Sequence, residues 1–165
     1  MISDIIFNSH KAFMLDNNMG VRGNISFGNY SGESYINRLF SGMIIEHSVF
    51  QFSDFSLSSF KDTEIKDCDF SGANFSKCDL NTCKFENCIF DMCNFNSADL
   101  TNAVFSNCTV TRCCFDYARM AWVQMDLPID PYSTFKDADL STTLEYYVQH
   151  RLSLIHISEP TRHSL

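Results

Sequence analysis

A repeat of five residues constrains the fold of this 165-residue chain more than any other feature. From Gly23 to about residue 142, a large apolar residue returns at every fifth position, and a small or slim residue usually lies two positions before it. A period of five fits neither the two-residue alternation of a strand nor the 3.6-residue turn of a helix. The backbone must therefore change direction within each repeat, which predicts a solenoid.

The repeat is regular enough to give each residue a position. The large apolar residue is the centre of its repeat, and the centres fall at residues 25, 30, 35 and so on to 140. Asp130 is the only centre that is not large and apolar, and twelve of the sixteen phenylalanines occupy centres. The position two before the centre is small or slim without a break from Ser48 to Val123. Chance does not produce such regularity.

Two stretches carry a resemblance to a known family. Residues 68–82 read Cys-Asp-Phe-Ser-Gly-Ala-Asn-Phe-Ser-Lys-Cys-Asp-Leu-Asn-Thr, and residues 98–102 read Ala-Asp-Leu-Thr-Asn. Both resemble the pentapeptide-repeat family, whose consensus is Ala-Asp/Asn-Leu-x-x, and the resemblance covers about 120 residues. It implies an all-β fold, a right-handed quadrilateral β-helix with four repeats per coil, in which the centre and the small residue both point inward. Residues 23–142 would then form about six coils.

With four repeats per coil, residues twenty apart stack at about the 4.8 Å spacing of neighbouring strands. One inner row of the predicted structural core then consists of Phe55, Phe75, Phe95, Phe115 and Phe135. A second row, at the small inward position, consists of Cys68, Cys88 and Cys108.

The eight cysteines could indicate a metal site or a disulfide framework. All but Cys114 occupy the small inward position, and four-residue gaps on a square coil send successive thiols toward different sides, which does not suit convergent zinc ligands. Stacked thiols such as Cys68 and Cys88 would have parallel Cβ vectors about 4.8 Å apart, whereas disulfides prefer about 3.8 Å. We expect packing residues with free thiols, no metal and no cofactor.

The segments before and after the repeats have their own predicted roles. Residues 1–22 are predicted to form an N-terminal cap, because a solenoid needs its open end covered, with a secretion leader as the alternative. Residues 143–151 would start a C-terminal segment. Residues 152–162 resemble a translated sequencing adapter, so we expect 152–165 to be a non-native tail and the native chain to be truncated near Arg151.

Residues 126–133 interrupt the repeat with two prolines, which cannot donate to a hydrogen-bond ladder. They form either a loop that protrudes between coils or two irregular repeats kept in phase. Because an exposed aromatic residue beside a protruding loop is typical of a binding anchor, this region is the predicted partner-binding site. Its candidate residues are Trp122, Asp126, Pro128, Asp130, Pro131 and Tyr132.

Charge and residue types limit the function. The net charge is −8, and residues 23–142 hold sixteen acidic and eight basic residues, which disfavours direct binding to nucleic acid. No apolar run is long enough to span a membrane. Outside the adapter-like tail the histidines are His10, His47 and His150, and no spacing predicts a catalytic set, so we expect no enzyme activity.

The family resemblance leaves two functional hypotheses. The first is a protein-interaction scaffold for an unidentified protein partner, as in bacterial effectors that are injected into host cells. The second is an acidic mimic of DNA that binds DNA gyrase or another topoisomerase. The acidity is spread over all four predicted sides, so we rank the mimic second. The protein would act in the bacterial cytoplasm, or in a host cell if it is secreted, and the sequence predicts no oligomeric state.

Overall fold

The structure of the chain, a computed structural model, describes residues 1–125, 130–140 and 142. The predicted segments 143–151 and 152–165 lie outside the described residues, as do Asp126 and Pro128.

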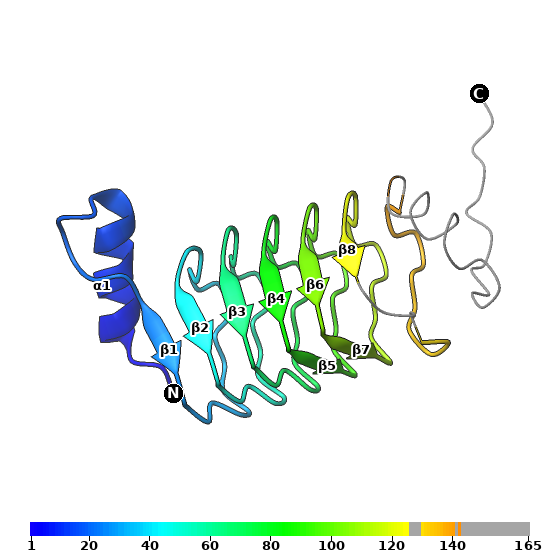
Figure 1. Cartoon of the computed structure of the whole chain (residues 1–165), viewed down its shortest axis with the longest axis horizontal. Helices are drawn as coiled ribbons and strands as arrows, with labels where there is room; N and C mark the ends of the chain where they lie inside the picture. The colour runs from blue at the N-terminus through cyan, green and yellow to red at the C-terminus, as the bar shows by residue number, and fades with distance from the viewer. Residues whose placement is uncertain (126–129, 141, 143–165) are drawn as a thin grey trace.

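The described residues form one helix and eight short strands (Figure 1). The elements are α1 (Asp4–Leu15), β1 (Asn24–Ser26), β2 (Ile44–Glu46), β3 (Glu64–Lys66), β4 (Lys84–Glu86), β5 (Ile89–Asp91), β6 (Val104–Ser106), β7 (Thr109–Thr111) and β8 (Gln124–Met125). All pairing is parallel, in a six-stranded sheet of order β1-β2-β3-β4-β6-β8 and a two-stranded sheet of β5 and β7. No described helix is long and apolar enough to cross a membrane.

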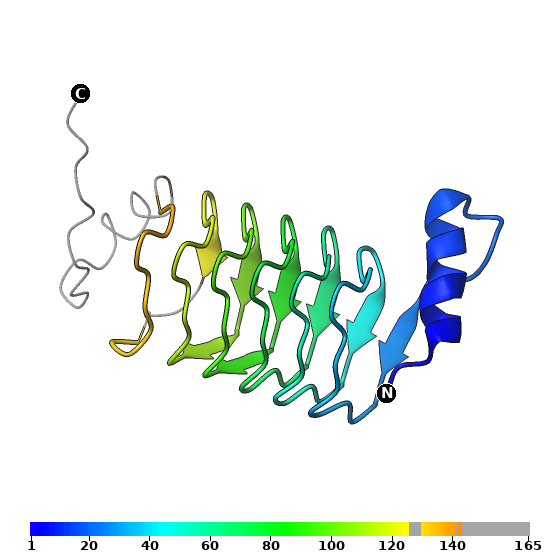
Figure 2. The same cartoon turned by 180° about the vertical axis from the view of Figure 1, so that it is seen from behind.

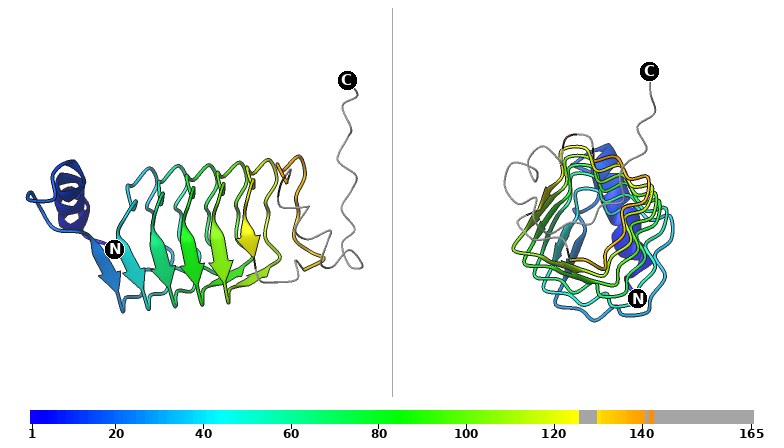
Figure 3. Two further views of the ribbon diagram at one scale, coloured as in Figure 1. Left: turned by 45° about the horizontal axis from the view of Figure 1, so that its top comes forward. Right: turned by 90° about the vertical axis from the view of Figure 1, so that its right-hand side faces the viewer.

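Strand pairing has a constant offset of twenty residues. Ile25 lies opposite Ile45, and Phe85 lies opposite Phe105, so one coil contains four five-residue repeats. Seen along its axis the chain follows a four-sided path (Figure 3), and Figures 1 and 2 show a right-handed winding. From β1 to β8 the coil makes about five turns, and residues 130–140 continue it through bridges such as Arg119 to Asp139. The predicted β-helix is confirmed.

Each side of the coil ends at a corner, two residues after the centre. The corner residues adopt left-handed backbone conformations even where the side chain is bulky, as at Phe52 (φ 57°) and Trp122 (φ 61°). The outward residue before the centre supports the turn: Asp54 Oδ1 accepts the Ser56 N–H at 2.9 Å. Short polar side chains favour such local hydrogen bonds. The Asp or Asn of the repeat is therefore a turn residue.

The centres fill the interior with stacked rings. In the predicted row, successive ring centroids are 5.1, 5.2, 4.9 and 5.0 Å apart from Phe55 to Phe135. The first four rings, Phe55, Phe75, Phe95 and Phe115, are at most 1% exposed, whereas Phe135 is only partly buried. Rings of neighbouring rows meet edge to face, the favoured geometry for aromatic pairs.

The small inward position has a second role besides packing. Ser53 donates its hydroxyl hydrogen to the carbonyl oxygen of Tyr30, twenty-three residues earlier, at 2.7 Å, and the Cys78 thiol does the same to Phe55 at 2.9 Å. Serine, threonine and cysteine share this role, since each is small and can donate to the coil below. The buried thiols of the predicted row, Cys68, Cys88 and Cys108, also donate to backbone carbonyls.

Helix α1 lies over the open end of the first coil (Figure 1). Phe7 packs edge-on against Phe40, with ring centroids 5.1 Å apart. His10 is fully buried and links the helix to the coil: its Nδ1 accepts the Gly23 N–H at 3.1 Å, and its Nε2 lies 2.8 Å from the Ser41 carbonyl oxygen. Because Nδ1 accepts, the hydrogen of the neutral ring is on Nε2 and is donated to Ser41.

The first prediction concerns the stacked rings. Replacing Phe75 by Ala removes a fully buried ring from the middle of its row and should lower the free energy of unfolding by about 3–5 kcal/mol in urea titration. Tyr132→Ala is the matched control, because that side chain is 76% exposed, and should change it by less than about 0.5 kcal/mol. Equal effects of the two substitutions would contradict the buried row.

The second prediction concerns the cap. His10→Ala leaves the Gly23 N–H and the Ser41 carbonyl without their partner, at about 1–3 kcal/mol for each buried group. Hydrogen exchange of the α1 amides should accelerate while that of the middle coils is unchanged. Lys11→Ala, at the exposed neighbouring residue, should leave α1 protected. Unchanged exchange in the His10 variant would show that the helix does not depend on this link.

Candidate protein-interaction surface

The outer faces are the place for a functional site, because packed side chains fill the interior of the coil. The centres and small residues from the first coil onward are packed against one another, most of them below 2% exposure. Among the described residues, no group of three or more His, Cys, Asp and Glu side chains could hold a metal ion. The outward residues therefore decide what the molecule can bind.

The predicted binding residues are exposed but do not form one patch. Trp122 is 61% exposed and Tyr132 is 76% exposed, and Pro131 is also exposed. Trp122 and Tyr132 are ten residues apart in a coil of twenty, so half a coil separates them and they lie at opposite corners of the four-sided path. The structure does not bring the two aromatic side chains together.

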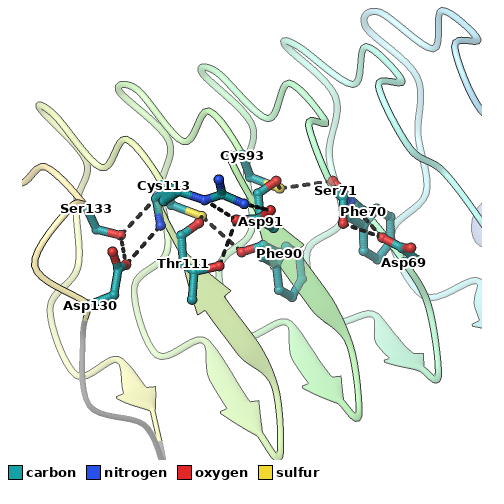
Figure 4. Close-up of polar contacts among 11 residues, drawn as sticks. Asp69, Phe70, Ser71, Phe90, Asp91, Cys93, Thr111, Cys113, Asp130 and Ser133 are labelled. Carbon is teal, nitrogen blue, oxygen red and sulfur yellow. Dashed lines mark hydrogen bonds and ion pairs between the residues drawn. The ribbon is translucent and has the colours of Figure 1, made fainter.

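Asp130, the one polar centre, has a structural role (Figure 4). Its carboxylate accepts hydrogen bonds from the Tyr132 N–H, the Ser133 hydroxyl and the Arg112 N–H, at 2.9, 2.6 and 2.9 Å. Burial acts to raise its pKa, but the hydrogen bonds, led by that of Ser133, lower it overall. Asp130 thus joins residues 130–133 to the preceding coil.

A second polar cluster joins two neighbouring coils on the same side (Figure 4). Asp91 Oδ1 accepts hydrogen bonds from Thr111 Oγ1 and Arg112 Nε, both at 2.8 Å, and Asp91 also forms an ion pair with Arg112. The hydrogen bond from Arg112 is the main cause of a lowered pKa at Asp91. With its oxygens engaged in this way, the carboxylate resembles a structural link rather than a catalytic base.

Sequence reasoning missed an apolar patch on the first two coils. Its four side chains are Ile36, Leu39, Phe52 and Leu57, with exposed fractions of 46, 38, 66 and 55%. Three of them belong to the side opposite the six-stranded sheet, and Leu39 lies on the next side, just beyond the corner at Asn37. Phe52 and Leu57 stand at the two corners of that side in the second coil, and Ile36 lies on it in the first coil. The signal was available, because bulky apolar residues at corner positions depart from the polar pattern.

Phe52 is held in place by the next coil. A Cβ atom at Gly72, the corner residue directly above, would lie only 2.4 Å from the ring, so the phenyl group rests against the glycine backbone. Gly72 has a φ of 72°, which glycine adopts at no steric cost. This contact gives the patch an aromatic side chain whose position is already restricted.

Some of the outward charges are paired between adjacent coils. Lys84 lies 3.2 Å from Glu64, Lys66 lies 3.0 Å from Glu86, and Arg119 lies 3.2 Å from Asp99. Such exposed pairs contribute little to stability, about 0–1 kcal/mol each. They do divide the acidic surface into short segments of mixed sign.

Comparison with known families agrees with this architecture. Residues 44–81 and 78–116 match the family of pentapeptide repeats, with eight copies of the repeat. This is a pentapeptide-repeat protein.

Solved structures with the same fold are distant in sequence. A trypsin-treated form of QnrB1, a plasmid-mediated fluoroquinolone resistance protein, aligns with a TM-score of 0.55 and 22% identity. That alignment covers 68% of this chain and 58% of the QnrB1 chain, so this chain spans less than two thirds of it. The pentapeptide-repeat protein Rfr23 from the cyanobacterium Cyanothece 51142 aligns with a TM-score of 0.48 and 10% identity over 78% of this chain and 98% of that one. A comparison with curated proteins found no match.

Several buried thiols of this pentapeptide-repeat protein are poor nucleophiles. Burial raises the pKa of Cys78 to about 12, and burial is also the main cause of raised pKa values at Cys83 and Cys93. These thiols stay protonated at neutral pH, whereas the reactive species of cysteine is the thiolate. Among the described residues, which include all eight cysteines, no disulfide is formed.

The third prediction follows from this burial. At pH 8 a thiol reagent should modify Cys114, the one cysteine that is not buried, and should reach the other seven only after denaturation. Peptide mapping by mass spectrometry identifies the modified residues, and Cys114→Ser should abolish the fast reaction. Rapid modification of several inward thiols in the native protein would contradict the packing assignment.

Proposed function

We propose that this pentapeptide-repeat protein is a non-catalytic scaffold that binds another protein through the outside of its coil. The observation that carries the proposal is the apolar patch of Ile36, Leu39, Phe52 and Leu57. Several large exposed apolar residues on one part of a surface are typical of protein-interaction sites, while exposed residues scattered singly, such as Trp122, need no such explanation.

The state of the polar groups supports a role without catalysis. The cysteines other than Cys114 are buried, and the carboxylates of Asp91 and Asp130 are used in hydrogen bonds between coils. A catalytic set needs a nucleophile or base that is exposed to a substrate and near an orienting group. The partner is a protein of unknown identity, met in the bacterial cytoplasm or, if the protein is an effector, in a host cell.

The second candidate is an acidic mimic of DNA that binds gyrase or another topoisomerase. Its support is the net charge of −8 together with the fold shared with QnrB1, a fluoroquinolone resistance protein. Mimicry requires continuous rows of negative charge, and the inter-coil pairs of Lys84, Lys66 and Arg119 interrupt them. A gyrase supercoiling assay with the purified protein tests this candidate directly.

The fourth prediction separates the two candidate surfaces. Asparagine tolerates the left-handed backbone of a corner, so a double variant with Phe52→Asn and Leu57→Asn should keep the fold while removing the aromatic and aliphatic contacts. The measurement is cross-linking in bacterial and host lysates followed by mass spectrometry. Proteins that the wild type enriches should be captured in amounts at least about tenfold lower by this variant.

Two further variants act as controls. Met92→Asn changes a half-exposed corner residue in the column of Phe52, two coils away, and should leave the captured proteins unchanged. A double variant with Trp122→Ala and Tyr132→Ala tests the site predicted from sequence. Loss of the same proteins in this second variant, with full capture by the Phe52 and Leu57 variant, would move the binding surface to residues 122–132.

A further inference from the structure

The outer face of the six-stranded sheet has a self-complementary pattern of charges. In each three-residue strand the middle side chain is buried, while the first and third face outward. On β3 these outward residues are Glu64 and Lys66, and on β4 directly beside it they are Lys84 and Glu86. The signs are opposite along each strand and across the two strands. The middle of this outer surface, named here the six-strand face, is therefore a checkerboard of four charges.

These four charges remain accessible. Lys84 and Glu64 are paired at 3.2 Å with side chains 64 and 59% exposed, and Lys66 and Glu86 are paired at 3.0 Å with both side chains 48% exposed. Half-exposed ion pairs can accept a second partner of opposite charge from another surface. A network of several charges is also more stabilising than an isolated exposed pair.

A two-fold axis that runs parallel to the strands, between β3 and β4, would place two copies face to face. This operation lays β3 on β4, β2 on β6, and β1 on β8 of the second copy, with the two coil axes antiparallel. Glu64 then faces Lys84 of the second copy, and Lys66 faces Glu86. An isologous interface requires such self-complementarity, because the same surface contributes to both sides.

The residues beside the charged centre match in the same arrangement. Ile44 on β2 comes opposite Val104 on β6, so an apolar residue meets an apolar residue, and Asn24 comes opposite Gln124. The other two-fold axis in the plane of the face, along the coil, would satisfy the four charges too. It would, however, place Ile44 opposite Glu46. The flanking residues thus select the antiparallel arrangement.

We propose that the six-strand face is a surface through which two copies of this chain associate, with their coil axes antiparallel. The proposal does not depend on the apolar patch, three of whose four residues belong to the opposite side of the coil. The face is about 24 Å long, from five steps of about 4.8 Å, and about 10 Å wide, from three residues per strand. Stable interfaces bury roughly 1,200–2,000 Å² in total, so this smaller contact gives a weak and salt-sensitive dimer.

Charge reversal tests the proposal. Sedimentation velocity over a concentration series measures the molecular mass of the protein at about 20 mM and about 500 mM salt. Charges are screened much more strongly at the higher salt concentration. The wild type should form dimers at low salt and dissociate at high salt. Lys84→Glu and Glu64→Lys, each alone, should weaken dimerisation at least about tenfold, because like charges then face each other twice.

Mixing the two variants distinguishes contacts between copies from contacts within one copy. In a mixed pair, positions 64 and 84 are both acidic in one chain and both basic in the other, so opposite charges face each other at both contacts. A one-to-one heterodimer should therefore form from two proteins that are each monomeric. Lys77→Glu alters the net charge of the chain as Lys84→Glu does, but lies at an exposed corner away from the face, and should dimerise like the wild type. Urea titration of each variant establishes that it is folded.

Three results together would support the proposal: dimers of the wild type, loss of dimers in each single variant, and recovery on mixing. A wild type that stays monomeric at low salt would overturn it, as would single variants that still dimerise or a mixture that stays monomeric. Because the apolar patch is untouched by these substitutions, a negative result leaves the proposed partner binding unaffected.

Discussion

The parallel hydrogen bonding between coils is the interaction on which the rest of the structure depends. Within one coil the strands are at most three residues long, too short to be stable alone. Each coil is stabilised by the next: Phe55 donates its N–H to the Asn74 carbonyl at 2.8 Å, and Asn74 donates to the Ser53 carbonyl at 2.9 Å. The constant offset of twenty residues keeps like positions above one another, so the rings stack, the small residues reach the carbonyls below, and Glu64 comes to lie beside Lys84.

This architecture could be predicted from the sequence because the same pattern of large and small inward residues returns in every repeat. The five-residue period, the small residue before each centre, and the twenty-residue stacking of Phe55 on Phe75 all follow from the pattern. The cap was predicted only as a segment, since the role of His10 depends on two backbone groups, at Gly23 and Ser41, that the repeat does not encode. The polar centre Asp130 looked like a break in the coil, and its carboxylate proves to be bonded to the coil before it.

The candidate site was harder to predict because the corners accept almost any side chain. A left-handed corner holds Phe52, Thr82 and Trp122 in nearly the same backbone conformation, so the residue type there reports little about the fold and more about the surface. Trp122 and Tyr132 fit the pattern of a binding anchor as aromatic residues near prolines, but only the position of each residue on the four-sided path shows that half a coil separates them. The same rule brings Phe52, Leu57 and Ile36 to one side.

The four-sided cross-section also determines how many partners an assembly could hold. The six-strand face and the side to which most of the apolar patch belongs are two sides apart, so they point in opposite directions. A pair of copies joined through the first would carry two copies of the second on its outermost surfaces, and the antiparallel axes would place them toward opposite ends. Such a pair would be bivalent: it would bridge two separate partner molecules, and it would gain avidity only for partners that are themselves arrayed, as in a filament or an oligomer.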